Sequence, residues 1–170
     1  MLSKTLLTLC SFFLLVGGCK VNYSLNGASI PADAKTVSVL YFTNSTALAP
    51  PTISQQFTEA LKDICASQTK LGLINKGGDL NFEGNISDYR VAPVAIQTND
   101  QTALNRLTIS VFVKYTNKLD EKKNFEATFS RYADFNGTES LASKEQDSEF
   151  LRQIYKQLTE DIFNKAFNNW

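Results

Sequence analysis

The clearest pattern in the chain is an alternation of apolar and polar residues over 106–116, with Phe112 as the one exception. A period of two is typical of a β-strand with one buried face. The alternation returns over 125–135, after the charged stretch Asp120-Glu-Lys-Lys123. Because two such strands joined by a short polar loop tend to pair with each other, these segments predict an antiparallel hairpin.

Two further segments predict strands. The segment 36–42 ends in four consecutive apolar residues, which favours a central strand buried on both faces. After a short apolar run at 71–74, alternation resumes over 80–91, with a phase slip at Asp88-Tyr89 that predicts a β-bulge or a strong twist. Pro93 has no amide hydrogen to donate to a neighbouring strand, so we expect this strand to end there.

Two segments repeat apolar residues every three to four positions, which is the spacing of an amphipathic helix. The first begins at Thr52-Ile-Ser-Gln55, a capping-box sequence whose side chains can satisfy free backbone amides, and should run to about Gln68. The second follows a similar sequence, Ser143-Lys-Glu-Gln146, and should run nearly to Trp170. We therefore predict one α+β domain in which two helices pack on one face of a mixed, roughly four-stranded sheet, a two-layer sandwich.

The first eighteen residues differ from the rest of the chain. Lys4 is their only charge, and an apolar run from Leu6 to Val16 precedes Gly17-Gly18, as in a secretory signal peptide. The alternative is a transmembrane anchor, but a spanning helix needs about 20 apolar residues and this run is shorter. We expect 1–18 to be a signal peptide that is removed.

The residues at the expected cleavage point, Val16-Gly17-Gly18-Cys19, resemble the bacterial lipobox. The resemblance implies that Cys19 carries diacylglycerol through a thioether and a further acyl chain, such as palmitate, on its amino group. One acyl chain holds a protein only marginally at a membrane, whereas two or three give stable attachment. The alternative is an ordinary signal peptide followed by a chance cysteine.

If Cys19 is lipidated, we expect residues 19–35 to form a lipidated tether and 36–170 to form the folded domain. Lys20 stands where an aspartate would favour retention at the inner membrane of Gram-negative bacteria. This position is compatible with delivery to the outer membrane, with the domain facing the periplasm.

Composition narrows the range of functions. The 170-residue chain has no histidine, and its 17 basic residues equal its 17 acidic ones. The lack of histidine excludes Ser-His-Asp and Cys-His nucleophile pairs and any metal site with a histidine ligand. The equal numbers of basic and acidic residues argue against nucleic acid as a partner, because proteins that bind phosphate backbones carry an excess of basic residues. Cys65 stands within the first helix and is expected to be a small buried hydrophobe. We expect a protein that is not an enzyme and needs no cofactor.

The lipobox at Cys19 and five segments of the domain resemble the LptE family of lipopolysaccharide-assembly lipoproteins. These segments are TVSVLYFTN, QQFTEALKD, GDLNFEG, ALNRLTISV and FSRYADF. The resemblance extends over about 37–170. It implies two helices on a mostly four-stranded sheet. It also implies a partner, the LptD outer-membrane barrel, which the lipoprotein plugs while helping the barrel to fold.

The same resemblance implies contact with lipopolysaccharide through basic residues near one end of the domain. The matching loop here, 97–106, is mostly polar and neutral, with Arg106 at its end. Arg90, Arg106, Arg131 and Lys144 flank strand ends or loops, where a cation can contact an anionic headgroup or simply face water. We take Arg106, Arg131 and Lys144 as candidate lipopolysaccharide contacts.

Two other functions remain open at this stage. A pilotin-like or structural lipoprotein of another envelope machine would need the same anchor and a similar globular domain. An anchored hydrolase is disfavoured, because the chain has no histidine and no recognisable catalytic motif.

The lipobox generates a direct test. Cys19→Ser should leave an unprocessed or soluble precursor, because the thioether cannot form on a hydroxyl. Fractionation of cells into membrane and soluble parts would measure this. A free, unlipidated Cys19 in the mature wild-type protein, found by mass spectrometry, would contradict the prediction.

Overall fold

The computed structural model describes residues 30–31, 33–94 and 103–168. The expected signal peptide, Cys19 and most of the expected tether lie outside the described residues, as does Trp170.

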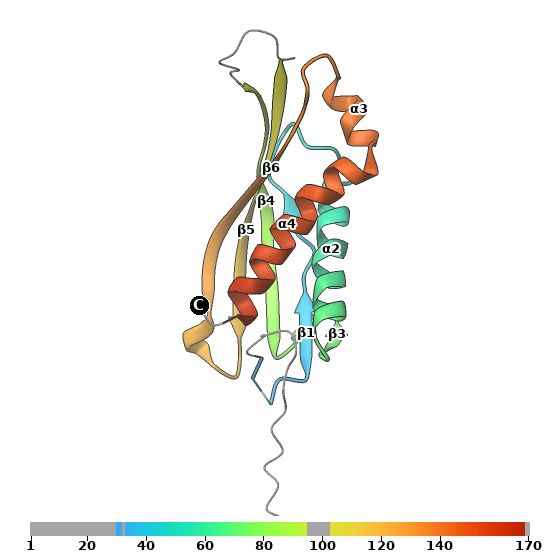
Figure 1. Ribbon diagram of the computed structural model, residues 1–170. Helices are drawn as coiled ribbons and strands as arrows, with labels where there is room; N and C mark the ends of the chain where they lie inside the picture. Colours follow the sequence, from blue (N-terminus) through green and yellow to red (C-terminus); the bar gives the residue numbers. More distant parts are fainter. Residues whose placement is uncertain (1–29, 32, 95–102, 169–170) are drawn as a thin grey trace, which may run out of the picture.

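The described chain folds into one sheet with helices on one side of it (Figure 1). In chain order the elements are β1 (Thr36–Val39), β2 (Thr43–Asn44), α2 (Ile53–Gln68), β3 (Gly72–Ile74), β4 (Leu80–Val94), β5 (Leu104–Asn117), the 3₁₀ turn η1 (Glu121–Lys123), β6 (Phe125–Asn136), α3 (Leu141–Gln146) and α4 (Ser148–Phe167).

The sheet has six strands in the order β3-β1-β4-β5-β6, and β2 pairs with β4 beyond the end of β1. Strands β3, β1 and β2 run parallel to their neighbours, whereas β4, β5 and β6 are antiparallel to one another. Helices α2 and α4 lie side by side on one face (Figure 1). The prediction of an α+β fold with a mixed sheet is confirmed. The strands beyond the predicted four are short, since β2 has two residues and β3 has three.

The long hairpin arm β4 follows the predicted alternation with one correction. The pairing of β4 with β5 shifts register between Ile86 and Asp88, which confirms the bulge. The expected end at Pro93 is wrong, because β4 continues to Val94 and Pro93 pairs with Asn105. Beyond Ile86, where β2 ends, β4 has a strand neighbour on one side only. A proline is tolerated in such an edge segment.

The first strand is also shorter than predicted. It ends at Val39, and of the expected doubly buried run Tyr41 is 59% exposed while Phe42 is fully buried. The Phe42 ring packs edge-on against Phe57 of α2, with 5.1 Å between the ring centroids. Gly84 of β4 makes this possible, since a Cβ there would lie 2.7 Å from the Phe42 ring. The chain therefore bends between β1 and β2 to insert one aromatic ring under the helix.

Neither predicted capping box forms. Thr52 already has helical backbone angles and makes no side-chain cap, because a capping side chain needs an extended backbone. The second helix is two helices, α3 and α4, divided at Asp147. Ser140 accepts a hydrogen bond from the Ser143 amide at the start of α3. Asp147 accepts from two amides at the start of α4, and its extended backbone ends α3.

The core lies between the sheet and the two long helices. It contains the buried side chains of β5 together with Phe57 and Leu61 of α2 and Leu158 of α4, all of which are fully buried. Cys65 of α2 is among them, as predicted. Burial raises the pKa of its thiol to about 12, so the group is an uncharged core residue.

The helix faces can be tested by truncation. Phe57→Ala and Leu158→Ala should each lower the free energy of unfolding by about 2–5 kcal/mol, because each leaves a cavity in the core. Lys62→Ala and Lys156→Ala, on the outer sides of α2 and α4, should change it by less than about 0.5 kcal/mol. Urea denaturation measures all four, and equal losses in the two pairs would contradict the assignment of the faces.

Candidate functional site

Among the described residues, the side of the sheet opposite helices α2 and α4 carries mostly polar side chains on β5 and β6, and we call it the outer sheet face. Its side chains alternate with the buried row of β5 and β6. On these two strands it consists of Arg106, Thr108, Ser110, Phe112, Lys114, Glu126, Thr128, Ser130, Tyr132 and Asp134. Hydroxyl and ion pairs tie it together across strands, as in the 2.7 Å contact between the Ser110 and Ser130 oxygens.

Arg106, the first candidate lipopolysaccharide contact, lies on this face opposite Asp134. Its Nε and Nη2 donate to the two carboxylate oxygens over 2.7 and 2.8 Å. The guanidinium also stacks on Tyr132, 3.7 Å from the ring centroid. These hydrogen bonds hold the pKa of the Asp134 carboxyl below its ordinary value. Arg106 is therefore a fixed, paired cation, although about a third of its side chain is exposed.

Arg131, the second candidate, makes an equivalent pair on the opposite side of the sheet. Its Nε and Nη2 donate to Asp161 of α4 over 2.6 and 2.8 Å. The pair raises the pKa of Arg131 and joins the free edge of the sheet to the helix. Arg131 is in register with Ile109, which is fully buried beneath the helices. Its side chain thus points to the helix side, away from Arg106.

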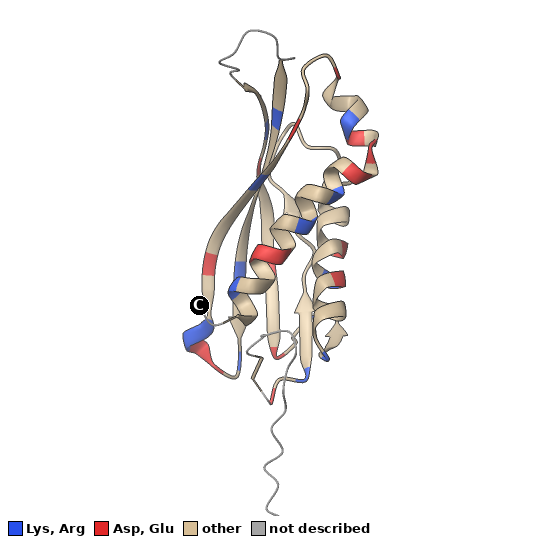
Figure 2. Cartoon of the chain, viewed as in Figure 1, with Lys and Arg blue, Asp and Glu red and all other residues tan. Residues whose placement is uncertain are grey.

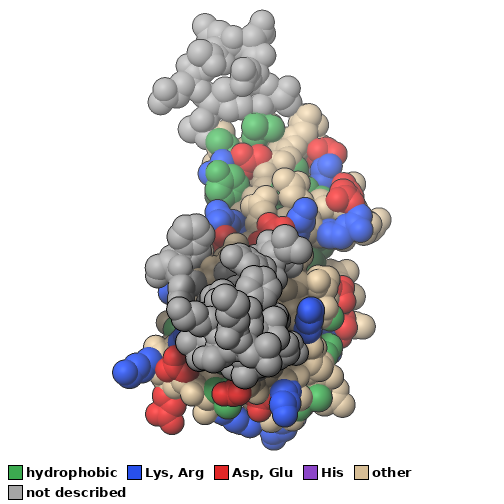
Figure 3. Space-filling view, turned by 60° about the horizontal axis from the view of Figure 1, so that its bottom comes forward, with side chains coloured by type: hydrophobic (Ala, Val, Ile, Leu, Met, Phe, Trp, Pro, Cys, Tyr) green, Lys and Arg blue, Asp and Glu red, His purple; other side chains and the backbone are tan. Residues whose placement is uncertain are grey.

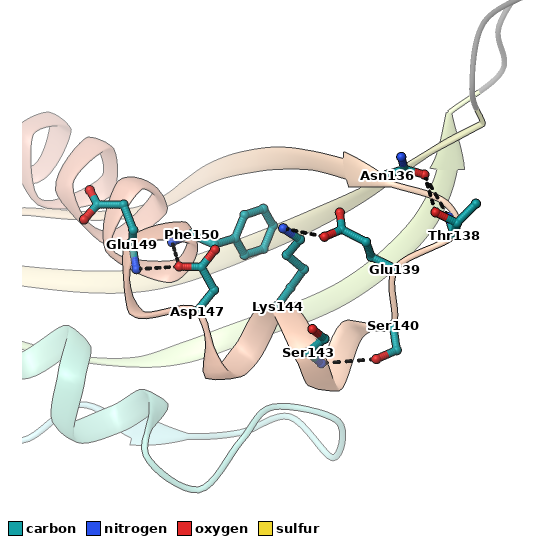
Figure 4. A network of polar contacts seen from close by, with 9 residues as sticks. All are labelled: Asn136, Thr138, Glu139, Ser140, Ser143, Lys144, Asp147, Glu149 and Phe150. Carbon is teal, nitrogen blue, oxygen red and sulfur yellow. Dashed lines mark hydrogen bonds and ion pairs between the residues drawn. The ribbon is translucent and has the colours of Figure 1, made fainter.

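Lys144, the third candidate, lies on α3 beyond the end of the core (Figure 4). Its Nζ is 2.9 Å from a carboxylate oxygen of Glu139 and 5.8 Å from the centroid of the Phe150 ring. A second contact holds α3 in place, because the buried Tyr89 hydroxyl donates to Glu145 over 2.7 Å. Desolvation raises the pKa of Tyr89, so the hydroxyl stays protonated and remains a donor.

The structure does not bring the three candidates together. They lie on the outer sheet face, on the helix side of β6 and on α3, and each is paired with a carboxylate. Figure 2 shows the same mixing of charge along the elements, with blue and red segments close to one another. The rest of the predicted binding loop, 97–102, lies outside the described residues. An anionic glycolipid would therefore have to displace or bridge an existing ion pair at each position.

The acidic partners were not predicted, although one of them could have been. Counting back from the hairpin tip places residue 134 opposite residue 106, so the register alone gives the Arg106–Asp134 pair. Asp161 could not be found in this way, because its position depends on how α4 packs against the sheet.

A groove of about 610 Å³ also runs between α2 and α4. Ala60, Ile64 and Leu151 line its apolar part. Its two basic side chains are both ion paired, Arg152 with Glu149 and Lys156 with Glu160. Four acidic side chains, Glu59, Asp63, Glu145 and Glu160, also line it, so the charge around the apolar part is acidic overall.

Within the part of the chain that the structure describes, no three acidic or cysteine side chains are grouped so that they could hold a metal ion. In the same part, no helix has the length and apolar character needed to cross a membrane. The arrangement as described offers polar surfaces for contact.

Solved structures place the fold in a class of small bacterial α+β proteins. One is a hypothetical protein from Chlamydia trachomatis, with 13% identity, a TM-score of 0.51, and coverage of 78% of this chain and 98% of that one. Another is an uncharacterized lipoprotein B from Nitrosomonas europaea, with 13% identity, a TM-score of 0.50, and coverage of 84% and 88%. At such identities the likeness shows the fold alone.

The family follows from the sequence itself. The family model described as "LptE: Lipopolysaccharide-assembly" matches residues 34–166, which is most of the chain. The chain therefore belongs to the LptE family of lipopolysaccharide-assembly lipoproteins, and the predicted resemblance is confirmed. No curated protein sequence matches the chain.

The Arg106–Asp134 pair generates a test of the first candidate. Asp134→Asn should strengthen binding of lipopolysaccharide by at least about threefold, because Arg106 would then be free to form a charge-assisted hydrogen bond with a phosphate. Arg106→Gln should weaken binding. Calorimetric titration of the purified protein measures both.

Lys62→Gln, which removes a paired cation from the middle of α2, is the matched control and should leave affinity unchanged. Asp134→Asn and Arg106→Gln should each change the free energy of unfolding by only about 0.2–1 kcal/mol, as for other partly exposed ion pairs. If affinity is the same in all three variants and the wild type, Arg106 is not a contact.

Proposed function

We propose that this chain is a non-catalytic lipoprotein of the outer membrane, anchored through Cys19 and facing the periplasm. In this proposal it partners and plugs an LptD-like β-barrel during lipopolysaccharide transport and outer-membrane assembly. Membership of the LptE family supports the general role. The barrel partner, the lipid anchor at Cys19 and the contact with lipopolysaccharide are what we propose beyond that general role.

The observation that carries the proposal is the polar outer sheet face. The lumen of a large outer-membrane barrel is polar and water-lined, so a plug needs a rigid polar surface to contact it. Hydroxyl side chains such as Thr108, Thr128 and Ser130 supply hydrogen-bonding groups on two strands that are paired along their length. The apolar side chains of the same strands are already used in the core.

The length of the strands also fits a barrel lumen. Strand β5 has 14 residues and β4 has 15. At about 3.4 Å per residue such strands extend over about 45 Å, which exceeds the roughly 25 Å height of the apolar band of an outer-membrane barrel. A sheet of this length can lie along the lumen and still project from one end.

In this role lipopolysaccharide would be a second ligand. Arg106, Arg131 and Lys144 would contribute only after each had exchanged its carboxylate for a phosphate oxygen. Such exchange favours weak, reversible contact, which suits a protein that passes a glycolipid onward more than one that stores it.

Depletion and co-purification test the proposal together. Depleting the protein should lower the amount of correctly folded barrel and of lipopolysaccharide at the cell surface, and the tagged protein should bring the barrel with it. If both quantities are unchanged, the LptE-type role is wrong. Co-purification of a secretin or of another envelope machine would then favour the pilotin-like alternative.

Two variants test whether the outer sheet face is the surface that contacts the barrel. Thr128→Arg projects a long charged side chain from the middle of that face and should reduce the amount of barrel that copurifies. Gln55→Arg adds the same charge on the exposed side of α2 and should not. Thermal denaturation of both variants verifies that they are folded.

A further inference from the structure

A group of lysines lies apart from the helices and strands. The eight basic side chains whose ion pairs are described above or lie along the sheet are on helices α2 to α4 or strands β4 to β6. Lys165 of α4 lies 5.2 Å from the centroid of the Phe125 ring. Six lysines lie in the loops and in the turn η1 at one end of the domain, which we call the lysine end. They are Lys35, Lys70, Lys76, Lys118, Lys122 and Lys123.

The sheet register brings these loops together. Thr36 at the start of β1 is in register with Gly72, and Val37 with Leu80. Leu80 is in turn in register with Asn117 at the end of β5. The loops that precede β1, β3 and β4 therefore meet the loop between β5 and β6 at the same end. In Figure 3, which turns this end toward the viewer, both basic and acidic side chains lie around its margin.

Two of the four carboxylates at the lysine end, those of Asp79 and Asp120, accept hydrogen bonds from the backbone. Asp79 accepts hydrogen bonds from the Lys35 amide, the Thr36 amide and the Thr36 hydroxyl, each over 2.9 Å. These bonds lower the pKa of Asp79, so it stays ionised but is already occupied. Asp120 accepts from the Lys122 amide at the start of η1. Lys35, Lys70, Lys76 and Lys122 are all exposed to solvent.

The result is a charge asymmetry in a chain whose formal net charge is zero. The lysine end has six basic and four acidic side chains, whereas the other described residues have nine basic and twelve acidic ones. An anionic surface would attract the first part and repel the second. Such a surface would therefore orient the domain as well as bind it.

The lysine end is also where the chain enters the fold. The Ala34 amide donates to the Pro31 carbonyl in a turn just before β1. An anchor at Cys19 would therefore hold this end toward the membrane, and here the inference rests on the proposed lipid attachment. Seventeen tether residues could extend over about 55 Å, so the anchor alone would leave the domain free to tumble.

We propose that the lysine end contacts the anionic phospholipid headgroups of the membrane to which the chain is attached. Each lysine close to an anionic membrane increases partitioning by a factor of about five, and the attraction falls off within a Debye length of about 8 Å. The contact fixes which end of the domain lies at these headgroups and which end lies farthest from them, namely the end that carries α3 and the tips of β4 and β5.

Vesicle binding by the unlipidated mature chain tests this proposal. The chain from residue 19, with Cys19→Ser, is mixed with vesicles of phosphatidylethanolamine and phosphatidylglycerol, and in parallel with vesicles of phosphatidylcholine alone. We expect binding to the anionic vesicles only, and loss of that binding as salt is raised. The combined variant of Lys35, Lys70, Lys76 and Lys122, each changed to Gln, should bind at least about tenfold more weakly.

The matched control changes Lys62, Arg90, Arg152 and Lys156 to Gln, which removes four paired cations from elsewhere and gives the same net charge. It should bind like the wild type. Equal loss in both variants would mean that binding follows net charge, and would overturn the proposal. No binding to anionic vesicles, or binding to lipopolysaccharide micelles alone, would also overturn it. Because no lipid anchor and no barrel are present, these outcomes are independent of the tests of the proposed function.

Discussion

The constraint on which this fold depends is that β4, β5 and β6 must keep their apolar side chains on the same side of the sheet. A slip of one residue in any strand would turn its apolar row to solvent and its polar row to the helices. Strand β4 satisfies the constraint through its bulge. The extra residue between Ile86 and Asp88 restores the phase, so that Ile86 and Tyr89 both face the core although they are three positions apart.

The same register organises the polar side of the molecule. It places Arg106 opposite Asp134 and brings the loops of the lysine end to one edge of the sheet. Asp134 on β6 neutralises a cation, whereas Asp79 and Asp120 at the lysine end bond to the backbone. One domain thus has a polar face of balanced charge and a basic end, and both follow from where the strands begin and stop.

Much of this could be predicted from the sequence, and the failures have physical causes. The long alternating segments and the helical stripes were predictable because each repeats its period many times. Strand β2 was not, since two residues cannot carry a period. The predicted long C-terminal helix is present as α4, but the expected capping box at Ser143 does not form, because Asp147 ends α3 and caps α4. At the candidate site, the cations could be chosen from sequence, but only the hairpin register gives a partner for one of them, and the partner of Arg131 depends on tertiary packing.

The lone cysteine of α2 has a consequence for the dynamics of the fold. Thiolate is the reactive form of cysteine, and Cys65 is both fully buried and shifted to a pKa of about 12. Oxidants and alkylating reagents therefore reach it only when α2 separates from the sheet. The rate at which Cys65 is modified in the native protein consequently reports how often this helix opens, so the chain contains its own probe of local unfolding.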